Sequence, residues 1–155
     1  MNVLIDTCVW SLVLRRTQPR VDLSLELQTL VADGRAAIIG PIRQELLSGI
    51  REKRHFDALR RNLEAFPDVH LGSADYERAA EYFNHARSFG VQGSNTDFLI
   101  CAVAVDRELS VFTVDGDFGR YADLFPLALH TFSSSAIGRV SEPGQSVRRV
   151  RVRGK

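Results

Sequence analysis

The sequence is poor in the residues and motifs on which several classes of site depend. Its two cysteines and four histidines lie apart, without the paired spacing of a zinc site. Neither G-x-x-x-x-G-K-[ST] nor G-x-G-x-x-G occurs, so we expect no nucleotide cofactor. The chemistry of this chain must therefore be sought in other residue types.

Long apolar runs are also absent. The longest, residues 98–105, is far shorter than the ~20 residues that span a bilayer. The polar Asn2 and the acidic Asp6 stand where a secretory signal has a basic and then a long apolar region. Cys8 and Cys101 each lie in an apolar segment and read as buried thiols. We therefore expect a cytoplasmic protein with a reduced interior and no membrane partner.

The net charge of +1 conceals an uneven distribution. Residues 146–155 hold five basic residues and no acid, which leaves residues 1–145 with a net charge of −4. A basic tail of this kind can bind phosphates or an acidic partner, or remain a solvated charged tail. We predict a folded domain at residues 1–132 and a C-terminal segment at residues 133–155. The predicted phosphate contacts of that segment are Arg148, Arg149, Arg151 and Arg153.

Short apolar strands alternate with amphipathic helices along residues 2–132. Gly34 suits a helix C-terminus, Pro41 suits a first helical turn, and Ser73 suits an N-cap. The alternation predicts an α/β fold around a parallel sheet. The expected strands are residues 2–6, 36–39, 69–71, 110–114 and 127–132. The expected helices are residues 23–33, 40–49, 56–66, 73–90 and 96–108.

Acidic residues fall where the working groups of such a fold gather, just beyond the C-terminal ends of the strands. Asp6 and Asp115 each close an expected strand, and Asp117 follows two residues later. Asp97 lies in the first turn of an apolar helix, where the helix dipole favours an anion. Glu45 shares the inward face of its helix, where an unpaired carboxylate is costly.

Each acid also has a purely structural interpretation. Aspartates at strand ends often belong to turns, and Asp97 can simply begin its helix. Glu45 can tilt outward or pair with Arg43 or Arg51. No basic residue lies close in sequence to the other acids, however, and converging carboxylates repel one another unless a cation binds. Oxygen ligands select hard ions, so the pattern predicts a Mg²⁺ or Mn²⁺ site.

Four segments, taken in chain order, resemble the acidic motifs of the PIN domain. They read LIDTCVW, PIRQELLSGI, GSNTDFLICAVA and VFTVDGDF. The short single-domain form, the leading Asp-Thr and the ELL-x-G helix look most like the VapC toxins of bacterial toxin–antitoxin pairs. The resemblance covers residues 2–132 and implies a three-layer α/β/α sandwich on a mainly parallel sheet.

The resemblance also implies roles for individual residues. The metal-binding and catalytic acids would be Asp6, Glu45, Asp97 and Asp115. Asp117 matches a further metal-binding acid that some members use, and the supporting polar residues would be Thr7, Asn95 and Thr96. The implied activity is Mg²⁺- or Mn²⁺-dependent cleavage inside RNA, with tRNA, rRNA or mRNA as substrate. The implied partners are a cognate antitoxin and a second copy of the chain. The basic tail, which we predict to bind RNA, departs from the compact family pattern.

Other interpretations remain open or fail on particular residues. A haloacid-dehalogenase-type phosphatase needs a second aspartate two residues after Asp6, where Cys8 stands. A receiver domain needs a lysine after its last strand, but none lies between Lys53 and Lys155. A PIN-like RNA-processing nuclease that is not a toxin, a nuclease that acts on DNA, and a scaffold with a decayed metal site remain as alternatives.

Overall fold

The computed structural model describes residues 1–14 and 17–133 of the chain. Five parallel strands form one sheet in the order β3-β2-β1-β4-β5, with Val3 of the central strand paired to Ala36 on one side and to Ser110 on the other. The strands are β1 (Val3–Ile5), β2 (Ala36–Ile39), β3 (Asp68–Val69), β4 (Ser110–Phe112) and β5 (Ala128–Leu129). The expected parallel α/β fold is therefore confirmed.

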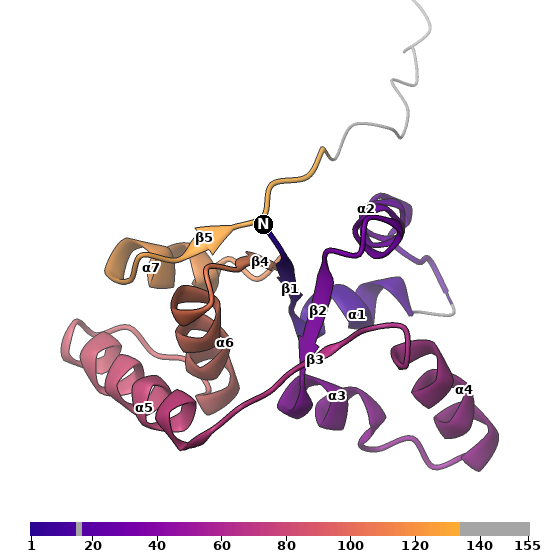
Figure 1. Ribbon diagram of the computed structural model, residues 1–155, viewed down its shortest axis with the longest axis horizontal. Coiled ribbons are helices and arrows are strands. Elements are labelled where there is room, and N and C mark those ends of the chain that lie inside the picture. The colour runs from indigo at the N-terminus through magenta and orange to yellow at the C-terminus, as the bar shows by residue number, and fades with distance from the viewer. Residues whose placement is uncertain (15–16, 134–155) are drawn as a thin grey trace, which may run out of the picture.

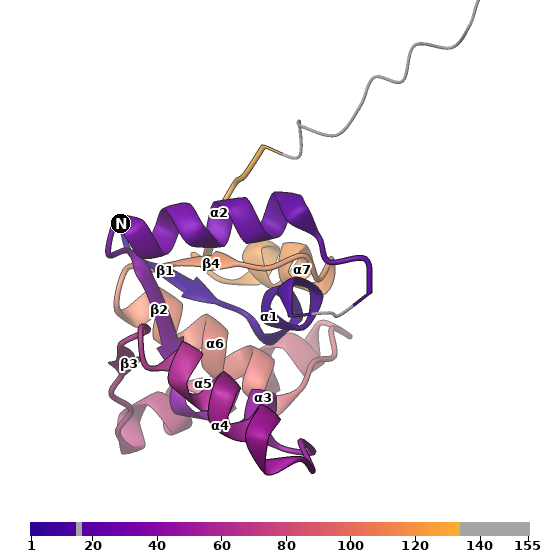
Figure 2. The same cartoon turned by 90° about the vertical axis from the view of Figure 1, so that its right-hand side faces the viewer.

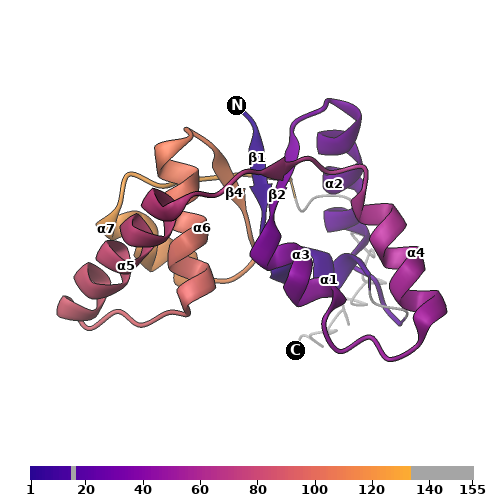
Figure 3. The same cartoon turned by 60° about the horizontal axis from the view of Figure 1, so that its bottom comes forward.

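Helices cover both faces of this sheet, as the α/β/α expectation requires (Figure 1). One layer contains α1 (Thr7–Val13), α2 (Val21–Ala32), α3 (Gly40–Leu47) and α4 (Lys53–Leu63), and Figure 2 looks onto it. The other layer contains α5 (Ser73–Ser88), α6 (Asn95–Asp106) and α7 (Asp117–Leu124). Figure 3 shows the sheet between the two layers. No helix of the described chain has the length and apolar character needed to cross a membrane.

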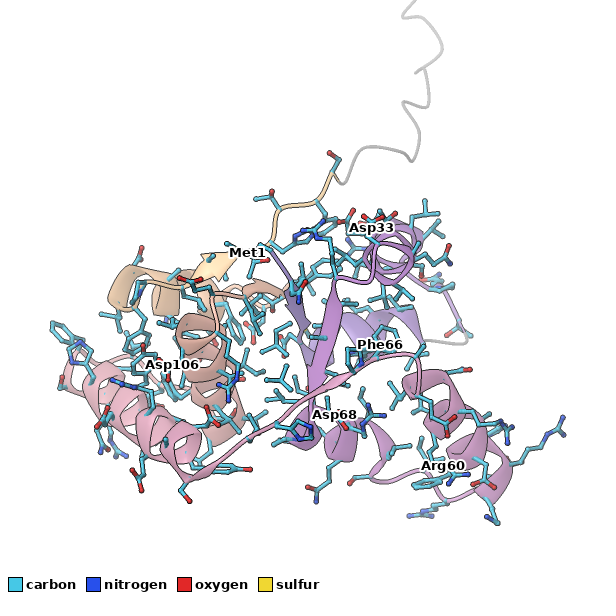
Figure 4. All side chains as sticks on the ribbon, in the orientation of Figure 1. Met1, Asp33, Arg60, Phe66, Asp68 and Asp106 are labelled. Carbon is cyan, nitrogen blue, oxygen red and sulfur yellow. The ribbon has the colours of Figure 1, made fainter. Side chains whose placement is uncertain are left out.

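The core is built around elements that are buried on every side. All residues of β1, β2 and β4 are buried, because helices pack on both faces of the parallel sheet. The helix α6 is buried from Phe98 to Ala104, since it lies between the sheet and α5. On the opposite face Phe66 packs edge-on against Trp10, while Arg60 lies on the outer side of α4 (Figure 4). The apolar run at residues 98–105 is thus a core helix.

Two short helices were not predicted from the sequence, and several boundaries differ from the expected ones. The helices α1 and α7 are only 7 and 8 residues long, and neither was expected. Ser73 is the first residue of α5 and not its N-cap, a position that Gly72 occupies. The strands β3, β4 and β5 are shorter than expected. The domain boundary at residue 132 stays a prediction, because residues 134–155 lie outside the described part, together with Arg148, Arg149, Arg151 and Arg153.

A buried ion pair fixes α5 against the end of α6. Arg107 donates to both carboxylate oxygens of Asp75, at 2.6 and 2.9 Å, and its guanidinium also donates to the carbonyl of His70. The same carboxylate accepts the backbone N–H of Gly72 at 2.7 Å, which caps the start of α5. The Arg107 guanidinium holds the pKa of Asp75 below its ordinary value. The pair therefore ties together the helix layer that borders one side of the site.

We expect Asp75→Asn to lower the free energy of unfolding at pH 7 by about 1.5–3 kcal/mol, because charge-assisted hydrogen bonds are lost from a buried group. A lowered folded-state pKa stabilises the fold above about pH 4, and this contribution disappears as the pH falls further. The difference between the two proteins should therefore shrink below about pH 4. Urea unfolding across this pH range checks it, with Glu77→Gln, an exposed acid of the same helix, as control. A difference that is independent of pH would contradict the ion-pair explanation.

Candidate active site

A cavity of about 400 Å³ opens at the C-terminal ends of the central strands. Asp6 follows β1 directly, Asp115 follows β4 by three residues, and α3, which begins where β2 ends, carries Glu45. Asp97 comes from the first turn of α6. The residues that line the cavity are Asp6, Thr7, Cys8, Ser11, Glu45, Ser94, Thr96, Asp97 and Asp115. The fold thus brings together the four acids that are far apart in the sequence.

Asp6 is the innermost of these acids, with 6% of its surface exposed. It is the N-cap of α1, and its Oδ1 accepts the backbone N–H of Thr7 at 2.7 Å. Burial raises the pKa of Asp6, hydrogen bonds from Cys8, Thr113 and the Thr7 backbone oppose the rise, and the charge of Asp97 adds to it. The charge of Asp97 therefore acts on the buried carboxylate across the cavity.

Thr113 is a residue of the site that the sequence analysis missed. Its hydroxyl donates to Asp6 Oδ2 at 2.8 Å and accepts the backbone N–H of Asp115 at 3.0 Å. One hydroxyl thus links the two acids that end neighbouring strands. The sequence did contain a signal for Thr113. It is the polar residue in an otherwise apolar segment, two positions before Asp115.

Cys8 is half-buried and packs against the core, and it also contributes to the same network. Its thiol donates to Asp6 Oδ2 at 3.0 Å and accepts the backbone N–H of Val114 at 3.4 Å. Burial raises the pKa of Cys8 to about 11, so the thiol stays protonated at neutral pH. Cys101 is fully buried, as expected, and both cysteines are free thiols.

Asp97 and Asp115 are each held by the start of a helix. Asp97 accepts the backbone N–H of Ser94 at 2.8 Å, while Ser94 Oγ accepts the N–H of Asp97 at 3.1 Å, which forms a capping box. Gly93 suits this loop, because a Cβ there would collide with the hydroxyl of Tyr121. Asp115 Oδ1 accepts the backbone N–H of Asp117 at 2.9 Å, at the first residue of α7.

Glu45 was expected on the buried face of its helix, but it is exposed and lines the cavity. It accepts a hydrogen bond of 3.2 Å from the hydroxyl of Thr7, which places Thr7 beside the acids as expected. The suggested pairing with Arg43 is wrong, because Arg43 donates to the carboxylate of Asp68 and to the carbonyls of Leu63 and Phe66. A short helix of two turns lets Ile42 be buried while Glu45 turns to the site.

The remaining predicted residues are only partly brought together. Thr96 lines the cavity, but Asn95 lines a neighbouring one. Asp117 is not among the residues that line the acidic cavity, and its backbone, rather than its side chain, contacts Asp115. Within residues 1–14 and 17–133, no three Asp, Glu, His or Cys side chains stand close enough to hold a metal ion as they are.

The donor set nonetheless suits a hard divalent cation. Four carboxylates border one cavity, and none of its described lining residues is a lysine, arginine or histidine that would neutralise them. Carboxylate oxygens are the ligands that Mg²⁺ and Mn²⁺ prefer. Since no three of these acids stand close enough to hold an ion as they are, some of their side chains must move before one can bind.

The family of the chain follows from comparison with known proteins. The model of the PIN domain matches residues 3–124, a segment that contains all four acids and every helix of the fold. The chain therefore belongs to the PIN domain family.

Relatives and solved structures agree with this assignment. The chain is 29% identical over 134 residues to the VapC ribonuclease Mb1587 of Mycobacterium bovis and to ribonuclease VapC11 of Mycobacterium tuberculosis, covering 84% of this chain and 98% of each relative. It is similar in structure to a chain of FitAcB from Neisseria gonorrhoeae, with a TM-score of 0.67 and 23% identity over 83% of this chain and 96% of that one. It is also similar to a chain of VapBC2 from Rickettsia felis, crystallised with a DNA fragment from its promoter, with a TM-score of 0.69 and 19% identity over 86% and 100%.

We expect Asp6→Asn to raise the melting temperature in EDTA by about 2–4 °C at pH 7. The change removes a buried charge that burial and Asp97 both disfavour, and an amide can still accept the N–H of Thr7. Thermal denaturation followed by circular dichroism measures the shift, with Glu77→Gln as a control outside the cavity. A clear fall in melting temperature would show that the ionised carboxylate holds the fold together.

Proposed function

We propose that this protein is a metal-dependent endoribonuclease that acts as the toxin of a toxin–antitoxin pair. The observation that carries the proposal is the acidic cavity, which is bordered by carboxylates from four separate elements and has no lysine, arginine or histidine among its described lining residues. The PIN domain assignment and the ribonuclease names of the mycobacterial relatives support the choice of RNA over other phosphodiesters.

A Mg²⁺ or Mn²⁺ ion would be held by Asp6, Glu45, Asp97 and Asp115, with Asp117 as a further candidate. When bound, the ion reverses the local negative charge, polarises a phosphoryl oxygen and makes water more acidic. Asp97 and Asp115 are the candidates to orient the attacking water and accept its proton, because they are more accessible than Asp6. The protonated thiol of Cys8 is unsuited to attack phosphorus, so we propose direct hydrolysis without a covalent intermediate.

Hydrogen bonds from the scaffold keep the acids at the cavity before substrate arrives. Thr113 holds Asp6 and the Asp115 backbone, and Ser94 holds Asp97. Thr7 spans the cavity toward Glu45, and Thr96 and Asn95 begin α6 beside the acids. Sequence-selective RNA recognition generally uses unpaired bases in loops, so we propose a single-stranded segment of tRNA, rRNA or mRNA as substrate.

The partners follow from the relatives. The similar chains of Neisseria gonorrhoeae and Rickettsia felis come from structures named as FitAcB and VapBC2, and a toxin–antitoxin complex from Klebsiella pneumoniae is also similar, with a TM-score of 0.57. We propose that a cognate antitoxin inhibits this chain and that the chain forms a homodimer. Cytoplasmic RNA as substrate, together with two free thiols, supports a cytoplasmic location.

The test is cleavage of total bacterial RNA by the full chain with Mg²⁺ or Mn²⁺ and with EDTA. We expect cleavage with metal only, reduced to background by Asp97→Asn, which keeps the helix cap but removes a charged ligand. Thr113→Val should lower the apparent metal affinity by about 10- to 100-fold, because residues that hold metal ligands typically contribute that much.

Two results would contradict this proposal. Cleavage in EDTA, or by Asp97→Asn at the rate of the unchanged protein, would remove the acids from the mechanism. If the melting temperature does not rise with either metal and no RNA is cleaved, the decayed-scaffold alternative is correct.

The basic tail is proposed to contact RNA phosphates through Arg148, Arg149, Arg151 and Arg153. Deletion of residues 146–155 should weaken RNA binding and reduce the slope of log affinity against log salt by about 0.7 for each lost contact with a single strand. Fluorescence anisotropy titrations at several salt concentrations measure the slope. An unchanged slope would show that the tail does not touch the RNA.

A further inference from the structure

A second cavity adjoins the acidic one and has a different chemical character. It has a volume of about 410 Å³ and lies where α5 packs along α6, near the start of α3. Its walls include Tyr76 and Phe83 of α5, Leu99 of α6, and the side chains of Asn84 and Asn95. We call this cavity the aromatic pocket. In Figures 1 and 3, α5 and α6 lie side by side over the same face of the sheet.

The aromatic pocket borders the acidic cavity at one residue. Thr96 lines both, and the next residue, Asp97, is one of the four acids. A ligand that places one group among the acids can therefore place its neighbouring group in the pocket. The described residues that line the pocket include no charged side chain, so it suits a neutral group and not a second phosphate.

The pocket carries the two features by which proteins bind an unpaired base. Tyr76 is 53% exposed, although it is a large aromatic residue on a helix, and Phe83, two turns further along the same helix, packs edge-on against Phe98 at 5.5 Å between ring centres. Exposed aromatic rings serve as stacking surfaces for bases. Asn84 and Asn95 are both exposed and offer amide donors and acceptors for a base edge.

A positively charged side chain, Arg87, lies beyond the aromatic pocket and could bind a phosphate of the same RNA strand. A smaller cavity of about 140 Å³ shares Phe83 with the aromatic pocket and is lined by Arg87 and Gln92. Arg87 takes part in none of the ion pairs within the described residues, whereas Arg78, on the same helix, binds Glu81 and Asp106. A nucleotide whose base fills the pocket has a phosphate on either side of its ribose, one of which would face the acids and the other Arg87.

We propose that the aromatic pocket binds the base of the nucleotide next to the scissile phosphate of a single-stranded RNA, with Tyr76 as the stacking surface. This inference rests on the proposed nuclease function and adds a subsite that selects unpaired RNA. A paired base is disfavoured, because it must first lose its pairing and stacking before it can enter the pocket.

The test compares Tyr76→Ala with Phe89→Ala, a matched change of an aromatic residue on the same layer that is 64% exposed and lies outside the pocket. Both are made in the full chain with Asp97→Asn to prevent cleavage. The probes are fluorescein-labelled seven-nucleotide RNAs of mixed sequence, each with one abasic position, and the readout is anisotropy. We expect Tyr76→Ala to weaken binding about 5- to 100-fold and Phe89→Ala less than about 2-fold.

The abasic series separates stacking from a general loss of structure. One abasic position should weaken binding by the unchanged tyrosine protein as much as Tyr76→Ala does, and the two changes together should cost no more than either alone. If the unchanged chain binds and cuts RNA but Tyr76→Ala weakens binding no more than Phe89→Ala does, the proposed subsite is wrong and the proposed nuclease function stands. If Tyr76→Ala lowers the sedimentation mass and no abasic position matches it, the pocket is instead a contact between copies of the chain. Absence of any RNA binding by the unchanged chain overturns both proposals.

Discussion

The carboxylate of Asp6 is the group around which the site is organised. It is buried at the end of the central strand and accepts hydrogen bonds from a backbone N–H, a thiol and a hydroxyl. A buried carboxylate without partners costs several kcal/mol, so the surrounding groups must be in place whenever it is ionised. These bonds join β1, α1 and the segment after β4 into one unit, and Thr113 extends that unit to Asp115.

The acids of the site have a second role as anchors of helix starts. Asp6 caps α1, Asp97 forms the capping box of α6, and Asp115 accepts the first N–H of α7. The partial positive charges of these helix N-termini offset part of the repulsion among the carboxylates. They do so in a cavity whose described lining residues include no lysine, arginine or histidine. The same anchors orient the acids, and the cation that would bring them together is supplied from solution.

The surface around the site divides binding between charge and stacking. A body with a net charge of −4 does not attract RNA by itself, so under the proposed function a bound cation and local arginines would hold the phosphates. The aromatic pocket is uncharged and offers Tyr76 and Phe83 beside the acids. Under the proposed function, stacking in this pocket would select single strands by a route that depends little on salt, beside a metal-dependent catalytic centre.

Much of the fold was predictable, because the periodicity of apolar residues reflects burial. The strand at 36–39 and the helix near 96–106 were found for this reason, and parallel strand ends placed Asp6 and Asp115 together. The helices α1 and α7 were missed because seven or eight residues hold too few apolar repeats to show a period. Glu45 was assigned to the wrong face because spacing along one helix does not show where the neighbouring helices stop covering it.

The sequence by itself determined which acids exist, their order and the strands and helices that carry them, since these depend on local pattern. Only the tertiary structure decided that Thr113 and Cys8 hold Asp6, that Asp117 stays outside the cavity, and that Tyr76 faces an open pocket beside the acids. These facts depend on contacts between residues as much as 107 positions apart. Such contacts are set by how the layers pack, and no local pattern encodes them.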